Sequence, residues 1–188
     1  MLQLRHPCSA IAADRLRRAF LPLLTLTLAV MLVMNWIGDE LQSEAAPAGI
    51  VTYEFAGDSS TAARILDSWG EQARLWASFS LGLDYLFLVL YSTTIALGCL
   101  WAAGRIGGSA PWLAAVGVPL AWGQWVAALC DATENAALTR MLLMAPSDGL
   151  AQLARWTASA KFALILAGLV YSALGALVWL IAGRRRTS

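Results

Sequence analysis

Three polar residues at the end of an apolar stretch carry the strongest indication of chemistry in this sequence. Asp131, Glu134 and Asn135 follow the apolar run AWGQWVAALC, which begins at Ala121. Residues three and four positions apart share one face of a helix, so these side chains would lie together. Ionisable groups in or beside a membrane span are costly to place there, which favours a functional site. A solvated helix end is the alternative for the same pattern, at a depth near the membrane interface.

Two kinds of chemistry fit this set of side chains. Carboxylate and amide oxygens suit a hard cation such as Mg²⁺ or Ca²⁺, for which Asp131 and Glu134 would be the ligands. Two neighbouring carboxylates can also act as general acid and base. The sequence has no haem, zinc or nucleotide signal, because its single histidine, His6, lies in the N-terminal tail and its three cysteines are scattered. The cofactor therefore stays unknown, and no metal site follows from the sequence alone.

Composition places the chain among membrane proteins. Of its 188 residues, 59% are hydrophobic and 13% are charged, whereas a soluble domain has about 45–50% apolar and about 25% charged residues. The length suits one bundle of helices without a second domain. A net charge of +1 and the lack of a basic, aromatic-rich surface pattern argue against a nucleic-acid partner. Membrane lipid is the partner that composition predicts directly.

Four apolar segments are long enough to be transmembrane helices, since about 20 residues cross a bilayer. We therefore predict an all-α polytopic membrane protein, a four-helix transmembrane bundle in a single domain. One sizeable extracytoplasmic loop would carry a short helix with Asp58 as its N-cap, preceded by an extended segment from Ile50 to Phe55. The predicted boundaries are tails at 1–18 and 183–188, spans at 19–38, 77–103, 111–135 and 156–182, and the loop at 39–75.

The positions of the arginines predict the orientation. Most of them lie in the two tails and at Arg105, whereas most acidic residues lie in the 39–75 loop. Cytoplasmic loops are enriched in Lys and Arg, so we expect both termini in the cytoplasm of a bacterium and the chain in its cytoplasmic (inner) membrane. The first span also resembles a signal peptide with a cleavage site near Ala48, but its apolar run is longer than usual, which favours a retained helix.

One ionisable residue on each predicted span lies at a similar depth. Counting about 1.5 Å per residue from the cytoplasmic helix ends puts all four roughly 30 Å from the inner surface. On the last three spans these residues belong to stripes that also contain small or polar residues, so we expect them to face the bundle interior. The stripes are Ser80, Asp84, Phe87, Tyr91, Thr94 and Gly98 on the second span, Gly117, Gln124, Asp131 and Leu138 on the third, and Lys161, Ile165, Gly168, Ser172, Gly175 and Trp179 on the fourth. The four ionisable residues are Asp39, Asp84, Asp131 and Lys161, and on the first span the stripe is Thr25, Leu28, Leu32, Asn35 and Asp39.

The charges in this layer do not balance. Lys161 is the single lysine of the chain, and the carboxylates that it does not neutralise must take up protons, reach water or bind a cation. Because Asp84 lies in an unbroken apolar run, we predict that it pairs with Lys161 and that Asp131 and Glu134 face an open pocket. An internal ion pair that fixes helix register is the alternative. The candidate ligand-binding residues are Asp39, Asp84, Asp131, Glu134, Asn135 and Lys161, with Tyr91, Gln124 and Trp125 as the pocket wall.

These patterns predict a membrane protein with an outward-opening acidic cluster that binds or carries a small cationic or amphiphilic ligand or a lipid. A structural or assembly subunit, bound to a membrane-protein partner, is one alternative, and its polar layer would only lock the helices together. A membrane-embedded enzyme that uses Asp131 and Glu134 as its acid and base is another. The sequence identifies no substrate and does not decide whether the protein is an enzyme.

Overall fold

The computed structural model describes residues 6–10, 13–108 and 110–184, and within them the regular structure is helical, without a strand. Four helices are long and apolar enough to cross a membrane, as the sequence predicts, which supports an integral membrane protein. The candidate spans are Arg18–Asp39, Glu71–Ile106, Pro111–Leu143 and Asp148–Ala182.

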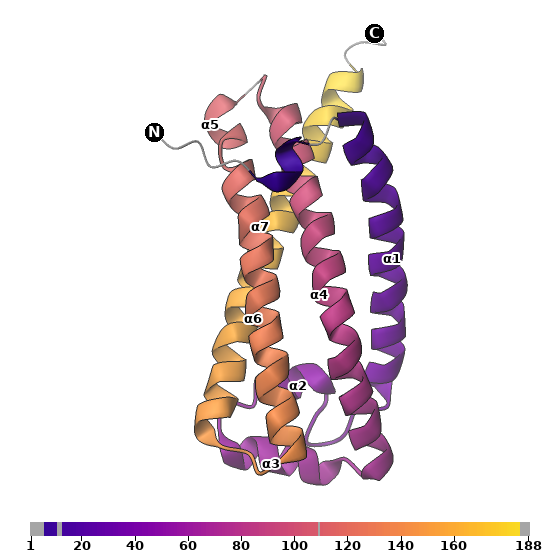
Figure 1. Ribbon diagram of the computed structural model, residues 1–188, viewed down its shortest axis with the longest axis vertical. Helices are drawn as coiled ribbons and strands as arrows, with labels where there is room; N and C mark the ends of the chain where they lie inside the picture. Colours follow the sequence, from indigo (N-terminus) through magenta and orange to yellow (C-terminus); the bar gives the residue numbers. More distant parts are fainter. Residues whose placement is uncertain (1–5, 11–12, 109, 185–188) are drawn as a thin grey trace. The chain divides into compact units, whose positions relative to one another are not determined.

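Figure 1 shows the helices in chain order, and the four long ones extend beyond most of the predicted span ends. A 3₁₀ helix, η1, precedes them, and α2 and α3 lie in the segment that the sequence assigns to the loop. The elements are η1 (Pro7–Ala10), α1 (Ala13–Asp39), α2 (Ile50–Glu54), α3 (Ser59–Ser68), α4 (Glu71–Ile106), α5 (Pro111–Ala114), α6 (Gly117–Leu143) and α7 (Asp148–Arg184).

The third candidate span is interrupted between α5 and α6. Proline has no amide N–H, and its ring clashes with the carbonyl four residues earlier, so Pro119 cannot continue a helix through Ala115. Within the first turn of α6 the same proline is tolerated, because amides there need no helical partner. Pro111 occupies the first turn of α5, as the sequence predicts. The break is therefore local and leaves both pieces helical.

The chain divides into two compact units, and each of the four long helices contributes to both. We call Met1–Leu26, Leu90–Ala127 and Phe162–Ser188 the first unit. The second unit consists of Thr27–Val89 and Ala128–Lys161.

In the second unit, the segment between α1 and α4 folds into a compact layer with its own buried residues. Tyr53 of α2 is fully buried, and its hydroxyl donates a hydrogen bond to the carbonyl of Leu138 on α6, at 3.2 Å. The indole N–H of Trp69 donates to the carbonyl of Leu41, at 2.9 Å, which joins the two ends of this segment. The core continues through Ala46, Ala62, Ile65, Leu66, Ala77, Leu81, Ala137, Met141, Ala151 and Ala154.

The prediction of an extended segment from Ile50 to Phe55 is wrong, because Ile50–Glu54 forms the helix α2. An isolated extended segment would leave its backbone N–H and C=O groups without partners, whereas a helical turn pairs them within the segment. Its alternating pattern is too short to overcome that cost. The consequence is that Tyr53 and Glu54 are both buried.

The predicted loop helix is confirmed as α3, and Asp58 is its N-cap. The Asp58 carboxylate accepts hydrogen bonds from the backbone N–H and the hydroxyl of Thr61, at 2.8 and 2.9 Å, and one from the hydroxyl of Ser60, at 2.6 Å. These bonds favour the charged form and lower the pKa of Asp58 to about 2. The cap therefore marks the start of α3 in the way that the sequence indicates.

In the first unit, small residues let the helices approach closely. A Cβ atom at Gly175 of α7 would overlap Ala102 of α4, and one at Gly168 would overlap the Gln124 side chain of α6. Small residues at such positions are the usual packing device between membrane helices, and the predicted stripe on the last span contains both glycines. The buried core of this unit accordingly consists of Ala96, Cys99, Ala102, Ile106, Ala121 and Tyr171.

The stripe that the sequence identifies on the first span lies on the exposed side of α1. Thr25, Leu28, Leu32, Asn35 and Asp39 are all exposed. The buried positions of α1 are Thr27, Val30 and Ile37 instead. The side chains of α1 are apolar on all sides of the helix, so its hydrophobic pattern does not distinguish an inner face. Exposed leucines are the surface expected toward lipid.

Candidate functional site

The second unit contains a buried ammonium group surrounded by carboxylates. Lys161 lies on α7, and its Nζ is 3.0 Å from Asp131 Oδ1 and 2.9 Å from Glu134 Oε2, both on α6. A third carboxylate oxygen, Glu54 Oε2 of α2, lies 3.8 Å from the same nitrogen. All four residues are at least nine-tenths buried, and Asp131 and Glu134 are only 2% and 0% exposed. Coulombic attraction in such an environment is strong, and these contacts hold α2, α6 and α7 together.

A second polar pair completes the cluster. Asn135, one residue after Glu134 on α6, donates a hydrogen bond from its amide to Asp84 Oδ2 of α4, at 2.5 Å. The carboxyl groups of Asp84 and Asp131 are also close enough to interact. The set Glu54, Asp84, Asp131, Glu134, Asn135 and Lys161 is called the charge cluster below.

The structure thus brings together five of the residues that the sequence selects: Asp84, Asp131, Glu134, Asn135 and Lys161. The helical spacing explains this for α6, because Asp131, Glu134 and Asn135 are three and four residues apart and share one face. The faces predicted for α4 and α6 are confirmed as buried at Ser80, Tyr91, Thr94, Gln124 and Leu138.

The pairing within this set differs from the prediction. The short contacts of Lys161 are with Asp131 and Glu134, and Asp84 accepts the amide of Asn135. One ammonium can bridge two carboxylates that lie one turn apart on a helix. Two ion pairs with α6 compensate the charge of Lys161 better than one ion pair with Asp84 of α4 would. Asp131 and Glu134 consequently do not face an open pocket, because they are buried around Lys161.

Glu54 is the functional candidate that the sequence analysis missed. It is 9% exposed and belongs to α2, the segment that the sequence predicts to be extended. Burial raises the pKa of Glu54, and the neighbouring Asp131 carboxylate raises it further, while the Lys161 ammonium opposes both effects. The sequence could have indicated this burial only if Ile50–Glu54 had been predicted as a helix, because Glu54 then follows Tyr53 in a partly buried turn.

Asp39 does not join the charge cluster. It is exposed at the end of α1, where it accepts a hydrogen bond from the Gln42 side chain, at 3.3 Å. The depth count that grouped it with the other ionisable residues measures height along a helix, and it carries no information on which way the side chain points. In the structure α1 is oriented about its own axis so that the side chain of Asp39 is exposed.

The three residues predicted as a pocket wall belong to the first unit. Tyr91 is buried on α4. The Gln124 amide on α6 donates hydrogen bonds to the carbonyls of Leu164 and Leu120, at 2.8 and 3.3 Å. The ring of Trp125 packs against the imidazole of His6, with centroids 4.6 Å apart. Each of these side chains therefore has a packing or hydrogen-bonding role inside the first unit.

The charge cluster holds more negative than positive groups. Three carboxyl groups, from Glu54, Asp131 and Glu134, lie within 4 Å of the ammonium of Lys161, and a fourth, from Asp84, is bound to Asn135. Among the described residues, no three His, Cys, Asp or Glu side chains are arranged to hold a metal ion. Lys161 itself lies between Asp131 and Glu134, the two residues that the sequence nominates as ligands for a hard cation.

Comparison of the chain with protein-family models, with curated proteins and with solved structures finds no match. No residue of the charge cluster therefore takes its role from a relative. What the cluster does must follow from its own contacts, burial and charge.

Proposed function

We propose that this chain is an integral membrane binding protein or carrier whose charge cluster takes a small cationic ligand, or the cationic head of an amphiphile or lipid. The observation that carries the proposal is the excess of buried carboxyl groups over the one ammonium of Lys161. Charges buried without full compensation are unfavourable, so protons or a cation must balance them. A ligand with an ammonium group would contact the carboxylates that Lys161 leaves uncompensated.

In this proposal the short helix α2 covers the charge cluster and moves away when a ligand enters. It brings Glu54 to Lys161 from a segment of only five helical residues. Gly49 precedes α2 and Gly57 follows it, and both have positive φ angles, 56° and 76°, that favour glycine. Small residues at such positions often act as hinges for a moving segment. Displacement of α2 would remove one carboxylate from Lys161 and open the cluster to a ligand.

We further propose that the charge cluster opens on the extracytoplasmic side of a bacterial inner membrane, with both termini in the cytoplasm. The support is the excess of arginine in the tails and at Arg105, compared with the acidic segment between α1 and α4. Alkaline-phosphatase and green-fluorescent-protein fusions after residues 45, 107, 147 and 188 test this arrangement. Phosphatase activity is expected at 45 and 147, and fluorescence there would overturn the orientation.

Ligand binding is tested by the thermal stability of the purified protein in nanodiscs with a panel of cations: sodium, choline, a polyamine and a long-chain alkylammonium. A ligand at about 100 times its dissociation constant should stabilise the folded state by about 2.7 kcal/mol. The Glu54→Gln variant should lose at least part of this gain, because it removes one carboxylate that balances the ligand. Glu44→Gln changes an exposed glutamate of the same segment and should leave the gain intact.

Two results would contradict the binding proposal. One is that no cation of the panel stabilises the wild-type protein, and the other is that Glu54→Gln and Glu44→Gln respond equally. An enzymatic role for Asp131 and Glu134 would additionally require Lys161 to move, since it is bonded to both.

A structural role is the second candidate, and the contacts of Lys161 favour it, because they join α7 to α6 and α2. The double variant Glu134→Gln with Lys161→Met separates the two candidates. If the cluster only locks helices, this variant should regain most of the stability that Lys161→Met alone loses, and the cell phenotype should be unchanged. If the cluster binds a ligand, stability should recover but cation binding should stay impaired.

A further inference from the structure

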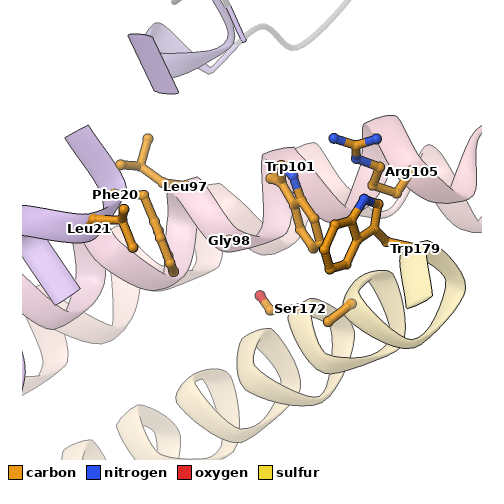
Figure 2. Close-up of a pocket in the computed structure, with 9 residues that line it drawn as sticks. Phe20, Leu21, Leu97, Gly98, Trp101, Arg105, Ser172 and Trp179 are labelled. Carbon is orange, nitrogen blue, oxygen red and sulfur yellow. The ribbon is translucent and has the colours of Figure 1, made fainter. Parts of the chain in front are cut away.

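A pocket of about 460 Å³ lies within the first unit, among α1, α4 and α7. Its volume falls in the range of about 300–1,000 Å³ that small-molecule sites occupy. Figure 2 shows its two ends: Phe20 and Leu97 lie at one, and the indoles of Trp101 and Trp179 lie at the other, with Arg105 beyond them. The pocket is thus apolar along its length and basic at one end.

Arg105 is the one charged residue among the nine that line the pocket. Its guanidinium lies 5.5 Å from the centroid of the Trp101 ring, and the Trp101 and Trp179 rings are 6.4 Å apart. Arg105 is exposed, and among the described side chains it takes part in no ion pair. Its positive charge is therefore available to an anionic group that enters from solvent or from the membrane surface.

The spacing of the lining residues gives the pocket a direction. Leu97, Trp101 and Arg105 are four residues apart on one face of α4, so the pocket extends over about 12 Å of helix. Tryptophan rings prefer the membrane interface, where one side is apolar and the other is hydrated. Trp101 and Trp179 consequently mark the depth at which a chain would give way to a head group, and Arg105 lies on the head-group side.

We infer that this pocket binds an anionic phospholipid of the surrounding bilayer, with its phosphate at Arg105 and an acyl chain along Trp101, Gly98 and Leu97. Basic residues beside apolar grooves between membrane helices are a known basis for anionic head-group recognition. The chemistry is opposite to that of the charge cluster, which lies in the second unit and attracts cations. The lipid site is independent of the proposed function and stands or fails separately.

The test is native mass spectrometry of the purified full chain, with phosphatidylglycerol and phosphatidylcholine that carry the same acyl chains. Wild-type protein should retain phosphatidylglycerol more tightly. Arg105→Gln should lower the affinity for phosphatidylglycerol about fivefold, the equivalent of one basic residue at a membrane surface. The affinity for phosphatidylcholine should fall less, because its choline ammonium offsets the charge of the phosphate. Ala176→Phe, which fills the pocket, should lower retention of both lipids.

Arg140→Gln is the matched control, because it removes another exposed arginine, from the last turn of α6 and outside the pocket. Equal retention of the two lipids by the wild-type protein would overturn the inference. An equal loss in Arg140→Gln and Arg105→Gln would also overturn it, since the attraction would then be unspecific. If Ala176→Phe fails to fold, the comparison of these two arginine variants decides the matter, because both residues are exposed. Thermal unfolding of both variants checks that loss of the contact between Arg105 and Trp101 leaves the fold intact.

Discussion

In the first unit the long helices meet through glycine and alanine, whereas in the second unit they meet through buried charges. Gly175 and Ala102 bring α7 and α4 close together in the first unit. In the second unit, Lys161 joins α7 to α6 and α2 through three carboxylates. Close packing needs only complementary shape, but a charge cluster needs every group to be balanced. We therefore expect stability in the first unit to depend on side-chain volume and stability in the second unit to depend on protonation.

The largest effect is expected from Lys161→Met, which removes the ammonium and leaves the carboxylates of the charge cluster uncompensated. Breaking a buried ion pair by removing one partner costs about 3–5 kcal/mol. The free energy of unfolding, measured in detergent by denaturant titration near pH 7, checks this. A loss below about 1 kcal/mol would show that the carboxyl groups protonate readily, and it would contradict the contrast between the units.

The corresponding change in the first unit is Gly175→Leu. A Cβ atom there would overlap Ala102, and overpacking of this kind costs about 1–3 kcal/mol. Gly104→Ala is the control, because nothing lies within 4 Å of a Cβ atom at that helical position. The cost of Gly175→Leu should be independent of pH, unlike that of Lys161→Met. A pH-dependent cost of Gly175→Leu would contradict the contrast, because it would show that protonation also affects the stability of the first unit.

Glu54 should make the free energy of unfolding fall as pH rises, because its pKa is raised in the folded state. Its folded-state pKa lies above the ordinary value of 4.5, so the folded state binds this proton more tightly than the unfolded state does. The resulting stabilisation is fully present below pH 4.5 and is lost as pH rises through the raised pKa. Unfolding curves at successive pH values should show this decline in the wild-type protein and a flatter profile in Glu54→Gln. An unchanged slope in that variant would contradict the assignment.

The smallest effect is expected at Asp58, whose contribution to stability changes with pH in the opposite direction to that of Glu54. Its pKa is lowered to about 2, so its stabilisation is present above the ordinary value of 3.8 and is lost as pH falls toward 2. Asp58→Ala should lower the melting temperature slightly by removing the cap of α3, whereas Asp58→Asn keeps a capping side chain and should change it less. Equal losses in the two variants would show that the charge, and not the cap, matters.

Much of the fold was predictable because the relevant signals are local. Mean hydropathy and segment length indicate four spans, and Asp58 indicates the start of α3. The spacing of Asp131, Glu134 and Asn135 also predicts a shared face, since the helix geometry alone determines it. The break at Ala115 follows from Pro119 and was available to the same reasoning.

The candidate site was predictable only in part. The helix faces of α4 and α6 place Asp84 and Asp131 inside, but apolar residues all around α1 hide its inner face and lead to the wrong choice of Asp39. Glu54 was missed for a different reason. Its burial depends on the position of α2 against Lys161, and the two residues are more than 100 positions apart in the chain.

By itself, the sequence determined the class of the protein, the approximate bounds of its spans and the list of charges that must be balanced. These follow from composition and from the 3.6-residue period of a helix, which depend on near neighbours in the chain. Only the tertiary structure decided that Lys161 contacts Asp131, Glu134 and Glu54, and that Asp84 binds Asn135. Several carboxylates could neutralise the same ammonium at similar energy, so the choice between them depends on how each helix is rotated and packed.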